Sequence, residues 1–504
     1  MHLAVLLLLL GSLDPAADAI REAEHNCRKG NYDAAIEISR KILKGSPGVV
    51  PARLILGRAL LKKDEVQAAL EETESALASS PRDPGLQALL GEVYFRQAEF
   101  ELAEAAYKKA LDADPKCARA HLGAGNLLAT QCLRRSARSE IETAYELDPD
   151  DPDVLLAWAR TRRAPTQEIE GLERYLRLVT DEDPKLLGQM RNELDLARQL
   201  NGRPTYVVTS KAASYRIKLL LLYDPLHLRK VGLLVSFNGG KPRRLQLDTG
   251  GYGILLNPRA AQAAGIKGLS ASTIRGVGDE GEKSGYFGLA ESVRIGDLEL
   301  RDCTVRFAGK SLVHDADGLI GTDVFRTFLI RLDLPNMMLE LAPLLETRAI
   351  TAPQVSQQEL DDSDRETLVA AAGLETFRSW RHLMLVRTTV NDSAMGHFVV
   401  DTGGFADLIS LDLLKKASGS VMKSRMGVVG LSGQVKDVYS GHEILLRFGR
   451  FHQRDPDILS IDLKKLSKDT GVEVGGVLGL PLLRVFTTTI NYRDGVVKFE
   501  YQKK

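Results

Sequence analysis

The 504-residue sequence predicts a multidomain α + β protein in which a helical repeat array precedes an all-β region built of two lobes. Two observations predict this organisation. In the first half, small residues and prolines recur at a 34-residue step. In the second half, residues 245–251 and 398–404 are two copies of one pattern, a short apolar run followed by Asp-Thr-Gly-Gly. Two copies with the same approach are much harder to obtain by chance than one tripeptide.

The bulk composition is that of an ordinary soluble globular protein, with 44% hydrophobic and 27% charged residues. Lys+Arg and Asp+Glu both number 67, so charge gives no reason to expect binding to nucleic acid or to an acidic membrane surface. The cysteines lack the close spacing of a zinc site or a disulfide scaffold. We therefore expect free or buried thiols, no metal and no cofactor. The four cysteines are Cys27, Cys117, Cys132 and Cys303.

The N-terminus has the outline of a secretory signal. Residues 3–10 are an almost unbroken apolar run, and small residues follow up to Ala19. The run is too short for a permanent membrane span, and no other stretch approaches that length. The run is preceded by His2 and by no Lys or Arg, which is unusual for a signal. We expect residues 1–19 to be cleaved from a secreted or periplasmic protein; an uncleaved anchor or a cytoplasmic helix is the alternative.

The first half, over residues 20–200, resembles an array of tetratricopeptide (TPR) repeats. Each repeat should be a helical hairpin in which small residues let the two helices approach and a proline ends the second helix. Four repeats are clear, a fifth over 155–184 is degenerate, and 185–200 reads as a closing helix. The recurring positions are Pro47, Pro81, Pro115 and Pro149; Gly57, Gly91 and Gly125; and Ala35, Ala69, Ala103 and Ala137.

The repeat frame and the signal interpretation conflict. The first repeat should begin near Asp14, so cleavage after Ala19 would remove the start of its first helix. Either the first hairpin is a truncated cap or the signal interpretation is wrong. By resemblance, a TPR array offers a concave groove to a peptide or a protein partner; the alternative is a scaffold or spacer without a peptide ligand.

After the helical repeats, residues 201–228 lead through a linker and first strands into two β lobes. We expect the lobes over 229–345 and 381–504, joined by 346–380. In each lobe a hairpin feeds the strand that ends in Asp-Thr-Gly-Gly. An apolar element ending in glycine follows 73 residues after Asp248, at Gly321, and 78 residues after Asp401, at Gly479.

Together these elements resemble the bilobal aspartyl proteases, pepsin-like in having two lobes and closer to the retropepsin-like enzymes in their short lobes. The resemblance covers roughly residues 229–504. It implies that Asp248 and Asp401 form one catalytic pair that hydrolyses peptide bonds with an activated water. Two carboxylates held close together cannot both ionise, so the pair keeps one proton and supplies an acid and a base, as the pepsin dyad does. A single chain can assemble this pair without dimerising.

The resemblance also assigns supporting roles. Thr249 and Thr402 should cross-bond beneath the two acids, and the glycines after them should allow a tight turn whose N–H groups orient the carboxylates. A second strand should pass under each turn at its glycine. Substrate-covering flaps are expected over 275–288 and 428–441. The remaining supporting residues are Gly250 and Gly403 in the turns, Gly321 and Gly479 in the second strands, and Gly278, Tyr286, Gly430 and Tyr439 in the flaps.

One departure from the pepsin-like pattern concerns pH. Pepsin-like enzymes commonly carry Ser or Thr directly after Asp-Thr-Gly, whereas this chain has Gly251 and Gly404. Because a donated hydroxyl lowers the pKa of a carboxylate, its absence predicts activity nearer neutral pH. A single Asp before glycine is often only a turn former. The alternative to an enzyme is therefore an adaptor that binds peptides in a protease-like cleft without cutting them.

Overall fold

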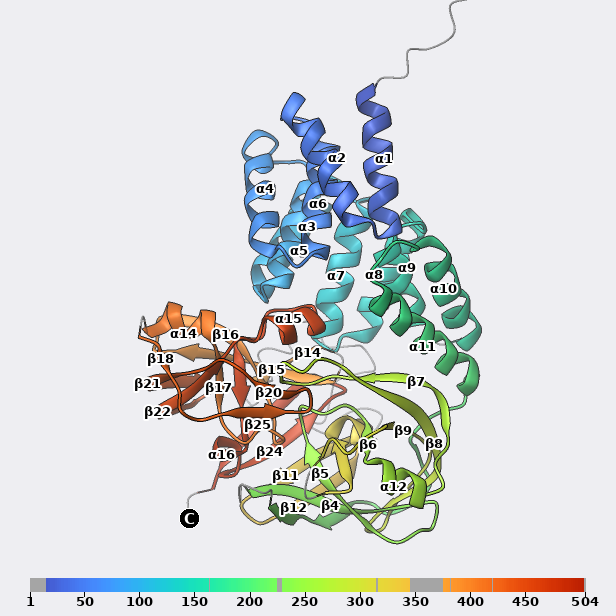
Figure 1. The fold of residues 1–504 in the computed structure, drawn as a ribbon, viewed down its shortest axis with the longest axis vertical. Coiled ribbons are helices and arrows are strands. Elements are labelled where there is room, and N and C mark those ends of the chain that lie inside the picture. Colours follow the sequence, from blue (N-terminus) through green and yellow to red (C-terminus); the bar gives the residue numbers. More distant parts are fainter. Residues whose placement is uncertain are drawn as a thin grey trace, which may run out of the picture. The chain divides into compact units, whose positions relative to one another are not determined.

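The chain divides into two compact units, Met1–Leu127 with Arg135–Leu194, and Leu128–Arg134 with Asp195–Lys504. Residues 1–14 of the expected signal and most of the expected joint 346–380 lie outside the described residues. The computed structural model describes residues 15–162, 164–223, 229–313, 316–344, 375–380, 382–418 and 420–502 (Figure 1).

The first unit is a TPR array, as the 34-residue step predicts (Figure 1). Each of the four prolines at the repeat ends follows the last residue of a second helix by two positions, which confirms that proline ends the hairpin. The degenerate fifth repeat is also a hairpin, and a closing helix follows it. The helices are α1 (Pro15–Lys29), α2 (Tyr32–Gly45), α3 (Val50–Lys62), α4 (Val66–Ser79), α5 (Pro84–Arg96), α6 (Phe100–Ala113), α7 (Ala118–Thr130), α8 (Arg134–Leu147), α9 (Pro152–Thr161), α10 (Pro165–Leu178) and α11 (Pro184–Leu200).

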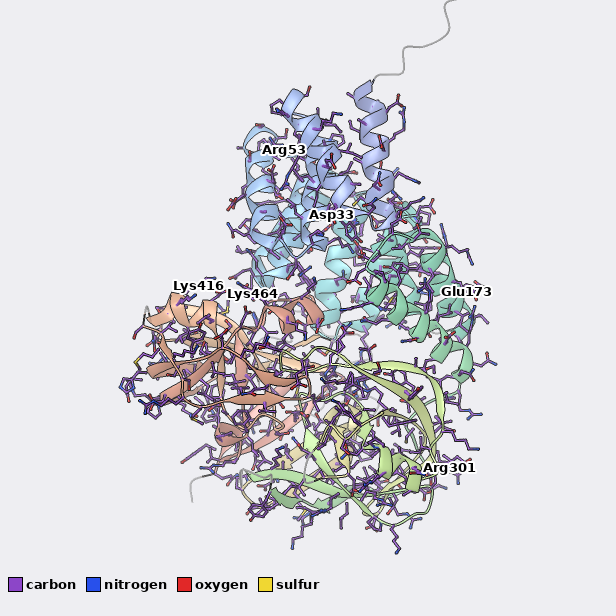
Figure 2. All side chains as sticks on the ribbon, viewed as in Figure 1. Asp33, Arg53, Glu173, Arg301, Lys416 and Lys464 are labelled. Atoms are coloured by element: carbon purple, nitrogen blue, oxygen red, sulfur yellow. The ribbon has the colours of Figure 1, made fainter. Side chains whose placement is uncertain are left out.

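The repeated small residues mark close helix contacts. A Cβ at Gly91 would collide with the Tyr107 ring, and a Cβ at Gly125 would lie 2.7 Å from Cγ1 of Ile141. A partly buried ion pair between Arg53 of α3 (labelled in Figure 2) and Glu72 of α4 (2.5 Å) adds to the second hairpin. The hairpins are thus held by close backbone approach and apolar packing together with such a pair.

The array closes on itself, because the first hairpin contacts the fifth. The amides of Thr180 (3.1 Å) and Asp181 (2.8 Å) donate to the carbonyl of Lys29, and the Tyr32 hydroxyl donates to the Glu182 carboxylate (2.5 Å). Between α3 and α9, Lys62 pairs with Asp153. The repeat pattern did not reveal this closure.

Helix α1 begins at Pro15 and continues through the expected cleavage point after Ala19. Its packing residues all follow that point: Ala23 is fully buried, and Ile20 and Cys27 pack against the same cluster. Cleavage of the signal therefore stays a prediction, and it would leave the packing face of the first hairpin in place. None of the helices in the described residues is long and apolar enough to cross a membrane.

The second unit is bilobal and rich in strands, in line with the predicted fold class (Figure 1). The sheet of the first lobe has the order β1-β9-β6-β10-β5-β4-β8-β7, with β3 paired to β4. Its strands are β1 (Val207–Val208), β3 (Leu220–Tyr223), β4 (Arg229–Phe237), β5 (Arg243–Asp248), β6 (Ile254–Leu256), β7 (Gly268–Ile274), β8 (Lys283–Ile295), β9 (Leu298–Ala308) and β10 (Gly318–Gly321).

The second lobe repeats the plan with the order β14-β15-β16-β23-β17-β22-β21-β18, and β19 and β20 form a separate small hairpin. Its strands are β14 (Arg378–Trp380), β15 (Leu383–Val390), β16 (Ala394–Val400), β17 (Leu408–Ser410), β18 (Met422–Lys423), β19 (Val428–Gly430), β20 (Gly433–Val435), β21 (Val438–Phe448), β22 (Phe451–Ile461) and β23 (Gly476–Leu478).

A third sheet joins the lobes, with the order β13-β25-β24-β11-β12-β2. The closing hairpins expected at the end of each lobe meet here, because β11 pairs with β24. The sheet also includes one strand from each expected linker, β2 from 201–228 and β13 from 346–380. The two lobes therefore belong to one body. Its strands are β2 (Tyr215–Lys218), β11 (Phe328–Asp333), β12 (Met338–Pro343), β13 (Glu375–Thr376), β24 (Phe486–Asn491) and β25 (Val496–Tyr501).

Short helices complete the unit: α12 (Pro258–Ala263), the 3-10 helix η1 (Thr322–Phe325), α14 (Leu411–Ser418), α15 (Lys464–Thr470) and α16 (Leu480–Leu483). Of these, η1 and α16 directly follow the glycine elements of the two lobes, where a short helix was expected. Lys464 of α15 pairs with Asp412 of α14 at the surface (3.3 Å, Figure 2). Apolar residues of both lobes form one continuous core under the three sheets.

Candidate functional site

The twin Asp-Thr-Gly-Gly stretches lie at the ends of equivalent strands. Strand β5 ends at Asp248, and Asp401 directly follows β16. In each lobe a short parallel strand runs beside the aspartate strand: Gly321 of β10 lies opposite Asp248, and Leu478 of β23 lies opposite Val400. The aspartates are thus fixed between a strand end and a neighbouring backbone.

The two turns are joined by reciprocal hydrogen bonds between threonines. The amide of Thr249 donates to the hydroxyl of Thr402 (3.1 Å), and the amide of Thr402 donates to the hydroxyl of Thr249 (2.9 Å). Each hydroxyl in turn donates across the lobe boundary, Thr249 to the Val400 carbonyl (2.7 Å) and Thr402 to the Leu247 carbonyl (3.0 Å). Both side chains are about 1% exposed, so no water replaces these partners.

The carboxyl groups of Asp248 and Asp401 meet above the threonines and hydrogen-bond with each other. Burial, and then the adjacent Asp401 carboxyl, raises the pKa of Asp248 well above its ordinary value. Each carboxylate also accepts from a glycine amide of its own turn, Asp248 from Gly250 (2.9 Å) and Asp401 from Gly403 (2.8 Å). Such a pair holds one proton over a wide pH range and can act as acid and base together.

Glycine is required in the turns by the opposite carboxyl group. A Cβ at Gly250 would lie 2.7 Å from Cγ of Asp401, and a Cβ at Gly403 would lie 2.6 Å from Cγ of Asp248. Neither glycine is among the positive-φ residues of the described chain. The tight turn that was expected is present, because the amides of Gly251 and Gly404 donate to the carbonyls of Asp248 and Asp401 (3.1 Å each). The glycine after each threonine also makes room for the partner aspartate.

Gly321 and Gly479, the glycines of the second strands, lie where the backbone of the second strand comes close to the turn. A Cβ at Gly321 would meet the carbonyl of Gly251, and a Cβ at Gly479 would meet the carbonyl of Ala406. In each lobe the second strand therefore touches the turn that carries the aspartate, as the resemblance implies.

Two further buried acids tie these strands to the turns. Asp323 accepts from the amide of Gly253 (2.9 Å), and Asp407 accepts from the amide of Gly479 (2.6 Å). Sequence reasoning missed both. The available signal was an acid beside an apolar strand in each lobe, after Ile320-Gly321-Thr322 and before Leu408-Ile409.

A histidine of the second lobe also reaches the first turn. Nε2 of His382 lies 3.1 Å from the carbonyl oxygen of Gly250, a geometry that makes Nε2–H the donor. Its ring lies 5.3 Å from that of Tyr252, which is itself covered by Arg306. The sequence gives no sign of this contact, because no nucleophile motif lies beside His382 in the chain.

The expected flaps are two hairpin tips that meet. Residues 275–282 join β7 to β8, and β19 with β20 forms the other tip. The amide of Glu280 donates to the Ser432 carbonyl (2.8 Å), and the amide of Ser432 donates to the Val277 carbonyl (3.0 Å). The Asp279 carboxylate accepts from the Lys436 amide (2.7 Å).

Of the four flap residues proposed, the structure brings two together. A Cβ at Gly278 or Gly430 would collide with the backbone of the opposite tip. Tyr286 instead lies on β8 with its ring 5.7 Å from that of Phe307, and Tyr439 lies on β21 opposite Ser460. The two tyrosines lie on the strands that continue from the tips, within the expected hairpins, and their contact with a substrate stays a prediction.

Gly251 and Gly404, which follow the two Asp-Thr-Gly triplets, differ in how much room a side chain would have. A Cβ at Gly251 would lie 3.0 Å from Cγ of Asp248 and from Cδ1 of Leu319. A Cβ at Gly404 would lie 3.3 Å from the nearest atom, the Asp401 carbonyl oxygen. The described residues contain no group of three or more His, Cys, Asp or Glu side chains that could hold a metal ion.

Comparison with known families agrees with this geometry. A family model described as aspartyl protease matches residues 233–324, which include Asp248 and Gly321. Two tetratricopeptide-repeat models match residues 28–93 and 89–152. The chain therefore resembles the aspartyl proteases in its β-rich unit and the TPR proteins in its helical unit. Among curated proteins, none matches the chain.

Solved structures are similar to parts of the chain. An aspartic proteinase from Irpex lacteus is 12% identical, with a TM-score of 0.36, covering 58% of this chain and 98% of its own. A thermophilic TPR protein from Thermus thermophilus is 27% identical, with a TM-score of 0.28, covering 36% and 98%. The PilF protein of Pseudomonas aeruginosa is 21% identical, with a TM-score of 0.25, covering 37% and 85%.

Proposed function

We propose that this chain, which resembles the aspartyl proteases fused to TPR repeats, is an aspartic endopeptidase whose catalytic pair is Asp248 and Asp401. The observation that carries the proposal is the pair itself: two carboxyl groups in hydrogen-bond contact on turns cross-bonded through Thr249 and Thr402. A structural aspartate at a strand end has no need of a second carboxyl facing it.

The chemistry follows from one proton shared by two acids. In the proposed reaction the ionised carboxylate takes a proton from a water as that water attacks the scissile carbonyl carbon. The member of the pair that holds the proton donates to the carbonyl oxygen and stabilises the tetrahedral intermediate. Collapse of that intermediate transfers a proton to the leaving nitrogen and restores the one-proton pair.

Cleavage of a peptide library by the full chain tests the proposal. Wild type should cut, while Asp248→Asn or Asp401→Asn alone should lower the rate on the order of 10²- to 10⁴-fold and leave the fold intact. A statine-type transition-state mimic should inhibit the wild type. A folded wild type that cuts no peptide and ignores the mimic would favour the adaptor, and a single mutant with full rate would refute the shared site.

We further propose that the TPR array acts in protein recognition, bringing a protein or peptide substrate to the protease unit. A spacer role is the alternative. Both interpretations are tested by comparing the cleavage of short peptides and of folded proteins by the full chain and by variants of the array. Recruitment predicts that array variants lose cleavage of proteins and keep cleavage of short peptides.

Export of the protein is a separate proposal, with residues 1–19 as the cleaved signal. It is supported by the retention of the Ile20, Ala23 and Cys27 packing face after the cleavage point. Mass spectrometry of the N-terminus of the protein from the cell envelope and culture medium tests it. A chain that begins at residue 20 supports export, and an intact N-terminus in the cytoplasmic fraction contradicts it.

A further inference from the structure

Asp323 and Asp407 lie on opposite sides of equivalent junctions: Asp323 is in η1, just after β10, and Asp407 directly precedes β17. Asp407 lies six residues after Asp401, where the first lobe has Ile254 six residues after Asp248. Asp323 lies two residues after Gly321, where the second lobe has Pro481 two residues after Gly479. Each lobe therefore has one carboxyl at this junction. The first lobe supplies it from the short helix that follows the second strand, and the second lobe from the segment that follows the turn.

Both carboxyls are enclosed and accept a backbone N–H at the junction. Asp407 is 5% exposed and accepts from Gly479 at 2.6 Å; Asp323 is 9% exposed and accepts from Gly253 at 2.9 Å. A buried N–H without an acceptor is strongly disfavoured, so each carboxyl fixes the distance between turn and strand.

The contacts continue to the catalytic aspartates. In the second lobe the amide of Asp401 donates to the Leu478 carbonyl (3.0 Å), and the amide of Leu480 donates to the Gly404 carbonyl (2.9 Å). Asp407 adds the third connection, at Gly479, between the same two segments. In the first lobe the amide of Gly321 donates to the Gly253 carbonyl (2.7 Å), beside the bond to Asp323.

We propose that Asp323 and Asp407 are reciprocal positioning residues, which hold the turns of Asp248 and Asp401 at the separation that the shared proton requires. This inference rests on the proposed function. A catalytic group displaced by 1 Å costs about 100-fold in rate, so a connection at the base of each turn acts directly on catalysis.

The positioning does not require a charge. Burial, with the carboxylate of Asp455 on β22 adding to it, raises the pKa of Asp407 to about 7. Burial also raises the pKa of Asp323, against the opposing effects of the Gly253 amide, Arg326 and Arg306. A protonated carboxyl still accepts through its carbonyl oxygen, and so does an asparagine amide. Asparagine should therefore replace either acid, and an apolar residue of similar size should not.

The test compares Asp407→Asn and Asp407→Leu in the full chain, with Asp455→Asn as a control that removes a neighbouring charge without touching the junction. Peptide cleavage gives kcat and KM, and 13C NMR of the Asp248 and Asp401 carboxyl carbons gives the titration of the pair. We expect Asp407→Asn and the control to stay within about twofold of wild-type kcat. Asp407→Leu should lose about tenfold or more in kcat at little changed KM and should shift the titration.

Wild-type kcat and titration in Asp407→Leu would overturn the inference. If Asp407→Leu does not fold, Asp407→Asn decides alone, since a loss of kcat in a folded Asp407→Asn variant would equally overturn the inference. The NMR readout separates the two proposals: if the wild type cuts nothing, the proposed function fails while the titration still reports on positioning.

A separate experiment tests whether the positions of Asp323 and Asp407 are reciprocal. Asp407→Ile combined with Pro481→Asp places the carboxyl of the second lobe in α16, at the position equivalent to that of Asp323 in η1 of the first lobe. We expect this double variant to recover about fivefold or more of the kcat lost by Asp407→Ile alone. An equal loss in the two variants would overturn the reciprocity of the two positions.

Discussion

Thr249 and Thr402 hold each other through their own amides and hydroxyls, at 3.1 and 2.9 Å, so the two lobes share one hydrogen-bond network directly beneath the aspartates. The pairing is symmetrical although the lobes differ elsewhere. Both hydroxyls also donate to carbonyls of the other lobe. A change at either threonine therefore leaves polar groups of both lobes without a hydrogen-bond partner.

Replacing either threonine with valine should therefore destabilise the protease unit. Thr402→Val keeps the shape but leaves the Thr249 amide and the Leu247 carbonyl without partners, at about 1–3 kcal/mol for each buried group. Thr402→Ser keeps the hydroxyl and serves as the control. Urea unfolding of the full chain measures the difference, and equal stabilities for the valine and serine variants would contradict the prediction. The double valine variant should lose less than the sum of the single losses.

Gly404→Ser should move the pH–rate profile toward acid. A Cβ at this position would lie 3.3 Å from the Asp401 carbonyl oxygen, a tight contact, and 3.5 Å from Oδ2 of Asp401, so a serine hydroxyl there can donate to that carboxylate. A hydrogen bond to the ionised form lowers the apparent pKa of the pair, by about one unit for a bond of about 1.4 kcal/mol. Gly404→Ala adds the Cβ without the hydroxyl and should leave the profile in place. A wild-type profile that peaks below about pH 4 would contradict activity nearer neutral pH.

The flap junction should depend on the Asp279 side chain. Asp279→Ala removes the acceptor of the Lys436 amide, which costs about 1 kcal/mol and should speed hydrogen exchange at the Glu280 and Ser432 amides about fivefold. Asp279→Asn keeps an acceptor oxygen and should exchange as the wild type does. If the alanine variant exchanges no faster than the asparagine variant, the junction does not depend on this contact.

Stability should fall with pH through the titration of Asp407. Its pKa is raised by burial from 3.8 to about 7, so the folded state binds a proton that the unfolded state has released. That contribution is present below about pH 4 and is lost as pH rises through 7. Asp407→Asn should therefore match wild type near pH 4 and exceed it by a few kcal/mol at pH 8, at about 1.4 kcal/mol per pKa unit. Urea unfolding at both pH values checks this, with the exposed Asp412→Asn as the control; a constant difference would contradict it.

Gly30 should be needed for the closure of the TPR array. Its φ is +89°, and a Cβ there would lie 2.8 Å from the Glu182 amide nitrogen. Gly30→Ala should cost about 1–2 kcal/mol in backbone strain and should expose the amides of Thr180 and Asp181 to hydrogen exchange. Gly45→Ala, where a Cβ meets nothing within 4 Å, is the matched control. Unchanged exchange at both amides in Gly30→Ala would show that the closure does not depend on this glycine.

The sequence was sufficient where a pattern is local or repeated. The 34-residue step predicts the hairpins because helix length, close-approach residues and terminating prolines recur within one repeat. The twin stretches predict the strand–turn units because their apolar runs and glycines lie within a few residues of each aspartate. Asp323 and Asp407 show the limit, since no local pattern connects either acid to the glycine amide from which it accepts a hydrogen bond.

By itself, the sequence determined the two classes of structure, the equivalence of the two lobes and the residue types of the pair. Only the tertiary structure decided that the glycines of the turns make room for the opposite carboxyl, that Asp323 and Asp407 connect turn to strand from opposite sides, and that the first TPR hairpin meets the fifth. The physical reason is distance along the chain. These contacts join residues about 70 to 150 positions apart, and a buried hydrogen bond between such residues leaves no periodic trace in the sequence.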